Sequence, residues 1–210
     1  MNRIARKTAA IALAVAAALI SAPAGAADID WTVETLTATD SSVLQTSGTP
    51  LYAYRGASSS LTLGDVTFEA GADLSAANIA FDPTFVAANV QSASNTGTLR
   101  GSAWNFNASS GMAEIKLTLK GLTNNRRYLV QILAHNSYGD SMITIGDKPS
   151  VNIKTGQYAS VHGSFTANGS SHDVVFLMGG AGGARYVNAI QVRELPSDEP
   201  EEKPVVIFVK

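Results

Sequence analysis

Cysteine is absent from the 210-residue sequence, and its absence excludes thiol catalysis, cysteine-bound metals and disulfide bonds. Charged residues are also scarce, at 15%, and long runs of the helix formers Glu, Lys and Leu are missing. The fold must therefore be stabilised by core packing and by hydrogen bonds within sheets. Because 45% of the residues are hydrophobic, the bulk of the chain is not expected to be disordered.

The sequence also lacks a membrane-spanning run near its start. The apolar stretch from Ala9 to Ile20 has twelve residues, whereas a transmembrane helix needs about 20. Its flanks are typical of a signal peptide: Arg3, Arg6 and Lys7 precede it, and Pro23 and Ala24-Gly25-Ala26 follow it. We therefore expect residues 1–26 to be removed, the mature chain to start at Ala27, and the protein to be secreted (periplasmic, cell-surface or extracellular).

Positive charge is in deficit once this leader is removed. The remaining chain has 12 basic and 17 acidic residues, a net charge of −5. Nucleic acids and anionic membranes attract basic surfaces, so neither nucleic-acid binding nor membrane insertion is expected.

What the sequence does contain is period-two alternation and small-residue turns, which are typical of β-strands. About ten short strands are expected at a spacing of roughly 8–12 residues. They are Trp31–Leu36, Leu61–Leu63, Val66–Phe68, Ile115–Lys120, Tyr128–Ala134, Met142–Ile145, Val151–Ile153, Val161–Phe165, Asp173–Met178 and Tyr186–Arg193. The pattern predicts one all-β domain over residues 27–195, an antiparallel β-sandwich or jelly roll, with Tyr128–Ala134 as a central strand.

One segment does not alternate. Ala70 to Asn89 is rich in alanine, and Leu74, Asn78 and Phe81 would share one face of a helix. A short helix or an irregular excursion is expected there.

The C-terminal segment changes character after the domain. Residues 196–204 form an acidic linker that contains proline and has no side chains to bury, and residues 205–210 form an apolar β segment. Because an exposed run such as Val205 to Val209 is a pairing hazard, we expect it to add as an edge strand. That strand would lie either in its own sheet or across subunits, giving self-association.

The order of strand and turn residues resembles that of exported bacterial jelly-roll modules of the galactose-binding-like and malectin-like type. The resemblance rests on Leu117–Leu122, Arg127–Leu133, Gly163–Gly169 and Asn188–Arg193, with Leu51–Tyr54 and Gly64–Phe68 upstream. It implies a jelly-roll fold and carbohydrate binding. The loop from His135 to Asp140 departs from the family pattern, in which an acidic residue and an arginine are common.

Catalytic motifs are missing. His135, His162 and His172 are not in a metal-binding spacing, there is no Gly-x-Ser-x-Gly motif, and no Lys-Ser/Thr follows the glycines at 179–183. No ligand-dense calcium loop surrounds Asp28, Asp30 or Asp40. We therefore expect no enzymatic activity, no metal site and no cofactor.

Sugar binding requires an aromatic face for the apolar side of the ring and planar polar groups for its hydroxyls. Candidates occur in three loops: His135, Asn136, Tyr138 and Asp140 in one, Arg185, Tyr186 and Asn188 in another, and Trp104 with Asn105 and Asn107 in a third. For Trp104 a place in the core is the competing interpretation, because tryptophan is usually well buried.

The sequence thus favours a binding module for carbohydrate or another exported polymer, with the site formed by loops at one end of the sandwich. A structural or adhesive surface component that assembles through its sheet edges is the alternative.

Overall fold

A computed structural model describes residues 29–36, 41–83, 85–89, 99, 102–106, 113–135, 141–154, 157–180 and 185–197. The expected leader, most of the acidic linker and the apolar segment from Val205 lie outside these residues. The described residues confirm the all-β sandwich. No helix among them has the length and apolarity needed to cross a membrane.

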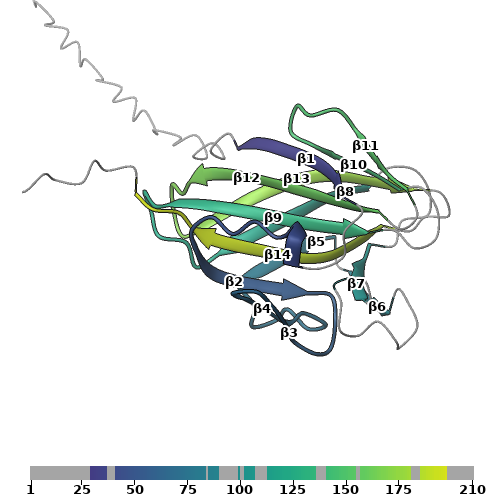
Figure 1. Cartoon of the computed structure of the whole chain (residues 1–210), viewed down its shortest axis with the longest axis horizontal. Coiled ribbons are helices and arrows are strands. Elements are labelled where there is room, and N and C mark those ends of the chain that lie inside the picture. Colours follow the sequence, from purple (N-terminus) through teal and green to yellow (C-terminus); the bar gives the residue numbers. More distant parts are fainter. Residues whose placement is uncertain are drawn as a thin grey trace, which may run out of the picture.

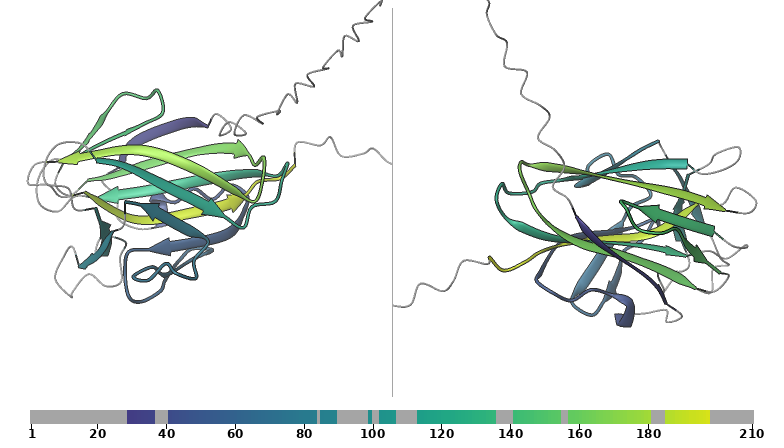
Figure 2. Two further views of the ribbon diagram at one scale, coloured as in Figure 1. Left: turned by 180° about the vertical axis from the view of Figure 1, so that it is seen from behind. Right: turned by 90° about the horizontal axis from the view of Figure 1, so that it is seen from above.

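Two sheets form the sandwich (Figure 1). The larger has the order β1-β12-β9-β14-β2-β4-β3, with β7 beside β14 and β6 beside β7, and the smaller has the order β11-β10-β13-β8-β5. The strands are β1 (Asp30–Leu36), β2 (Thr49–Arg55), β3 (Leu61–Leu63), β4 (Val66–Ala70), β5 (Ile79–Asp82), β6 (Val86–Asn89), β7 (Ser102–Asn105), β8 (Ala113–Lys120), β9 (Arg127–His135), β10 (Ser141–Ile145), β11 (Val151–Ile153), β12 (Tyr158–Thr166), β13 (Ser171–Gly180) and β14 (Tyr186–Glu194), with a 3-10 turn η1 (Ser41–Val43). Only the β2–β4 pair is parallel among these ladders. Figure 2 shows the smaller sheet from behind and the two layers from above.

Alternation along the strands builds the core between the sheets. In β8, Ile115, Leu117 and Leu119 are buried, while Lys116 and Thr118 point outward. The expected central strand β9 is covered on both faces: Val130 and Ile132 belong to the core, and Leu133 packs into a second cluster on the outer face of the larger sheet.

That second cluster exists because two segments fold over the outer face. One is the β3–β4 hairpin, whose turn has Gly64 at a φ of 60°, a conformation that glycine adopts without strain. The other is a segment we call the strap, residues 41–48. The cluster that they complete on this outer face consists of Val43, Leu44, Ala53, Val66, Phe68, Leu99, Leu133 and Ala189.

Polar side chains on β9 and β14 hold the strap. Gln131 donates from Nε2 to the Val43 carbonyl oxygen at 2.8 Å and accepts the Gln45 amide at 3.0 Å. Gln191 donates to the Gln45 carbonyl oxygen at 3.0 Å. Arg193, although 1% exposed, donates to the carbonyl oxygens of residues 46, 47 and 48. These backbone amide and carbonyl groups of the strap are therefore hydrogen-bonded where the strap packs on the sheet and excludes water.

The helix expected within residues 70–89 is wrong. Strands β5 and β6 lie in this window. Residues 71–78 are irregular, which agrees with the alternative expectation of an irregular excursion. The reason is tertiary: Ile79 and Phe81 pair with Leu119 and Leu117 of β8, so their side chains join the core of the sandwich. Strand β7, at Trp104, was also missed by the sequence pattern.

Candidate functional site

The sheet registers gather several of the sequence-predicted site residues at one end of the larger sheet. His135 ends β9 and pairs with Tyr158, and Tyr186 begins β14 and pairs with Asn105 of β7. Val187 pairs with both Ala134 and Trp104. The strands that carry these candidates are therefore neighbours. Asn136, Tyr138, Asp140 and Asn107 lie outside the described residues.

Trp104 is fully buried, so the structure corrects its assignment as a ligand-binding residue. Its exposure is 0%, and its indole N–H donates to the Gly71 carbonyl oxygen at 2.7 Å. The backbone at Gly71 lies so close to the indole that an added Cβ would be 2.6 Å from the ring. The core interpretation of this tryptophan is the one that the structure supports.

Arg185 is likewise buried, at 0% exposure, with Nε donating to the Met178 carbonyl oxygen at 3.1 Å. Asn188 donates to the Leu99 carbonyl oxygen at 3.2 Å from a buried position. Tyr186 is half-buried. Arg185 and Asn188 thus hydrogen-bond the protein's own backbone, and burial keeps their side chains from a ligand in solution.

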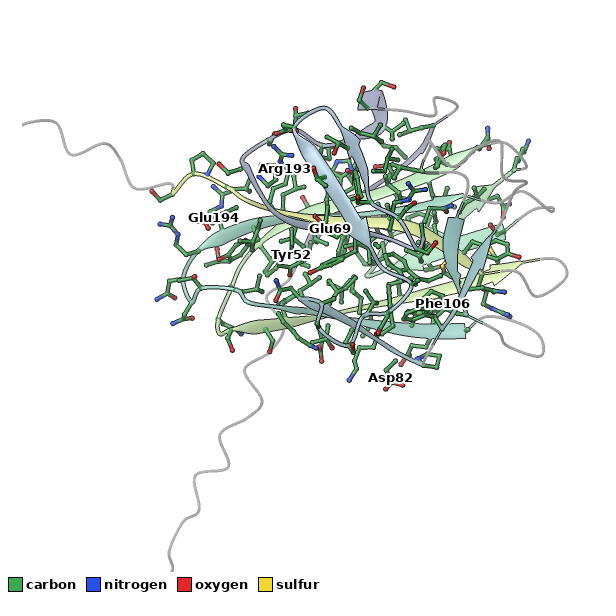
Figure 3. The ribbon with its side chains drawn as sticks, turned by 90° about the horizontal axis from the view of Figure 1, so that it is seen from below. Tyr52, Glu69, Asp82, Phe106, Arg193 and Glu194 are labelled. Atoms are coloured by element: carbon green, nitrogen blue, oxygen red, sulfur yellow. The ribbon has the colours of Figure 1, made fainter. Side chains whose placement is uncertain are left out.

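A different group of residues forms an aromatic hollow at the β5 side of the sandwich. This hollow has a volume of about 510 Å³ and is bounded by Asp73, Leu74, Ser75, Phe81, Phe85 and Lys120, among others. Its two phenylalanines are half-buried and make an edge contact at 5.7 Å. Figure 3 views this part of the molecule from below, with Asp82 at the edge of the smaller sheet and Phe106 further inside.

Two buried aromatic side chains, Trp104 and Phe106, support the two phenylalanines from behind. The ring centroid of Phe81 lies 5.2 Å from that of Trp104 and 4.9 Å from that of Phe106. Phe85 contacts the same two rings at 6.1 and 6.3 Å. Trp104, which is anchored by its hydrogen bond to Gly71, therefore packs behind both rings of this aromatic surface.

Polar groups of both signs stand at the rim. Asp73 accepts the Ser75 amide through Oδ1 at 2.9 Å, and this hydrogen bond holds the pKa of the Asp73 carboxyl below its ordinary value. The carboxylate is therefore ionised near neutral pH and available as an acceptor. Lys120, at the end of β8, is exposed and has three donors. An aromatic surface beside an acceptor and a donor suits a ligand with both apolar and hydroxylated faces.

Sequence reasoning missed this site because its parts come from separate elements. Phe81 and Phe85 flank the Asp82-Pro83 dipeptide, while Asp73 and Ser75 belong to the irregular 71–78 segment. The one local signal is the pair of phenylalanines four residues apart around a proline. Within an alanine-rich stretch, Phe81 was assigned to a helical face together with Leu74 and Asn78, and Phe85 was not singled out.

Two other hollows occur among the described residues. We name the larger the edge groove; it measures about 560 Å³ and lies between Ile29–Trp31, Gly146–Lys148 and the first half of β13. A smaller one of about 380 Å³ lies beside Leu51 and Glu194. In the described part of the chain no three His, Asp or Glu side chains are grouped as a metal site would require. Asp30 forms an ion pair with Lys148 at 3.2 Å, and Asp28 and Asp40 lie outside the described residues.

Comparisons with known proteins give no family assignment: no protein-family model and no curated protein matches the sequence.

Proposed function

We propose that this protein is an exported, non-catalytic module that binds carbohydrate in the aromatic hollow. The observation that carries the proposal is the half-buried pair of Phe81 and Phe85, supported from behind and bordered by Asp73 and Lys120. The apparent signal peptide and the resemblance to carbohydrate-binding jelly rolls support the same function, but the hollow replaces the expected loop site as the place of binding.

The chemistry of the hollow favours a neutral sugar over other small ligands. One face of a pyranose is lined by C–H groups and stacks on an aromatic ring, while its hydroxyls exchange hydrogen bonds with acceptors and donors at the edge. A carboxylate and an ammonium group on the same rim provide no net charge to select an ion. Because the aromatic layer is preorganised, little side-chain entropy is lost on binding.

Truncating the aromatic surface is expected to weaken binding. A glycan array identifies the ligand, and calorimetry then compares wild type with Phe85→Ala and Asp73→Ala. Loss of one stacking ring removes about 1 kcal/mol or more, so Phe85→Ala should raise Kd by about fivefold to tenfold. Asp73→Ala removes a charged acceptor and should raise Kd by at least as much.

The matched control is Val175→Ala, which shortens an exposed side chain of β13 away from the hollow. It should leave Kd unchanged, and circular dichroism should be the same for all variants. Unchanged affinity in both Phe85→Ala and Asp73→Ala would refute the hollow as the site. Asn136, Tyr138 and Asp140 would then become the first residues to mutate.

A structural or adhesive role is the second candidate function. It is favoured by one specific observation, a stretch of β13 that has a hydrogen-bonding partner on one side only in the described part of the structure.

A further inference from the structure

Strand β13 has neighbouring strands on both sides along only part of its length. It pairs with β8 from Ser171 to Met178, but its ladder with β10 covers only Phe176 to Gly180. After Ile145 the chain turns away into residues 146–150. Among the described residues, the stretch from Ser171 to Val175 therefore has a strand on one side alone. Such an edge presents backbone donors and acceptors to whatever can pair with them.

The edge groove lies against this open stretch. Its walls are Trp31 of β1, the turn at Gly146 and the side chains of residues 172–175, and the Lys148–Asp30 ion pair bounds one rim. Two large hydrophobic side chains are exposed in the described part of the chain, and Val175, at 46%, is more exposed than Leu51. A hydrophobic residue on an unpaired edge is a combination that native sheets usually cover.

We propose that Val205 to Val209 of the same chain adds to β13 along Ser171 to Val175 and covers the edge groove. The two stretches match in length, at five residues each, and neither contains proline, so every residue can take part in the ladder. The segment from Val205 to Val209 is uncharged and rich in β-branched residues, which favour strands. Its apolar side chains suit a groove that is lined by Val175 and Trp31.

The linker can reach this position. The registers run from Asp30 to Ser164, from Ser164 to Leu129 and from Leu129 to Arg193, so the groove and the end of β14 lie at the same end of the larger sheet. Three strand spacings lead from β14 to β1 and amount to about 14 Å, and β13 lies in the smaller sheet, about 10 Å further across the sandwich. Eight residue steps separate Ser197, the last described residue, from Val205 and span up to about 26 Å when extended.

The hollow beside Leu51 is nearer to the exit of the chain but is a poorer acceptor. Pro50 has no backbone N–H, and the β14–β2 register shifts between Val192 and Arg193, leaving Leu51 out of the ladder. A proline and a bulge are the devices that protect an edge from pairing.

The tail that pairs with β13 is expected to come from the same chain and not from a second copy, because the linker raises its effective concentration. A flexible linker of this length holds the segment at an effective concentration in the millimolar range, far above that of a second molecule in dilute solution. Exchange between two copies would bury the same surface but would gain nothing from the linker.

The absence of native cysteine permits a direct test in the full mature chain. Val175→Cys is combined with a tail cysteine, either Val205→Cys or Val209→Cys, since these residues lie opposite residue 175 in an antiparallel and in a parallel ladder of the two stretches, respectively. Glu114→Cys replaces Val175→Cys in the matched control, because Glu114 is also exposed on the smaller sheet but lies on β8. After mild oxidation, we expect an intramolecular disulfide in one Val175→Cys pair and at least tenfold less in the control pairs.

Amide exchange provides a readout that does not depend on register. Amides of residues 171–175 should exchange at least tenfold faster in a chain that lacks residues 198–210 than in the full chain, while those of β9 are unchanged. Unchanged exchange, or equal cross-linking at 175 and 114, would overturn the proposal. Cross-links found only between two molecules would also overturn it and would favour the structural role.

Discussion

Replacing Trp104 by alanine is expected to lower the free energy of unfolding by about 3–5 kcal/mol, the usual range for deleting a buried aromatic side chain. The indole is fully buried, contacts Phe81 and Phe85, and satisfies the Gly71 carbonyl oxygen. Its loss leaves a cavity behind the aromatic hollow and an unpaired carbonyl in the loop. Urea denaturation of wild type and variant measures the effect.

The control for this prediction is Phe85→Ala, which removes a half-buried ring from the same cluster. It should cost clearly less stability than Trp104→Ala, because part of the phenylalanine surface already contacts water. If Trp104→Ala cost less than about 1 kcal/mol, the indole would not be a core residue, and the sequence-based assignment of Trp104 to a binding loop would regain its place.

The second large effect is expected at Arg193. Arg193→Met keeps most of the side-chain volume but removes the guanidinium that binds three carbonyl oxygens of the strap and the Asp65 carboxylate. Leaving these carbonyls without a partner should cost about 3 kcal/mol. Amides of residues 41–48 should also exchange faster, because the strap loses its main anchor. Chemical denaturation and amide exchange measure the two effects.

Asp65→Asn is the matched control, because it removes only the exposed partner, whose side chain is 56% accessible. The hydrogen bond from Arg193 lowers the pKa of the Asp65 carboxyl below its ordinary value. The unfolded chain therefore takes up this proton first as the pH falls below about 4, and the contribution of the pair is lost through the folded-state pKa. In Asp65→Asn, the free energy of unfolding should therefore fall less steeply below about pH 4, and it should change little at pH 7. A cost equal to that of Arg193→Met would contradict the account of the strap.

Most of the sheet could be predicted from the sequence because alternation is a local signal. The runs around Ile115, Leu129 and Ile190 alternate or are apolar throughout, and each forms a strand where expected. Strands β5, β6 and β7 have neighbouring apolar residues, in the sequences IAFD, VAAN and SAWN, and so lack the polar/apolar alternation that identifies a strand. The pairing of β5 with β8, of β7 with β14 and of β6 with β7 is a property of the assembled sandwich.

The candidate site was harder to predict than the fold, for a physical reason. Composition suggests that Trp104, Arg185 and Asn188 are ligand groups, yet burial and backbone carbonyl partners give them structural roles. Phe81 and Phe85 are half-exposed at the place where the 71–78 segment and the end of β8 border a hollow. Exposure of an aromatic residue depends on its tertiary neighbours, which no local pattern reports.

The central claim is that sugar binds in front of Trp104, and the two tryptophans of the chain allow a direct test. Trp104 lies behind the aromatic hollow, whereas Trp31 lines the edge groove on the other side of the sandwich. In Trp31→Phe, Trp104 is the only tryptophan, and titration with the glycan identified on the array should shift its emission with a saturable curve that matches the calorimetric Kd. In Trp104→Phe the emission of Trp31 should not respond. A response carried by Trp31 alone, or measured binding with no change at Trp104, would contradict the claim.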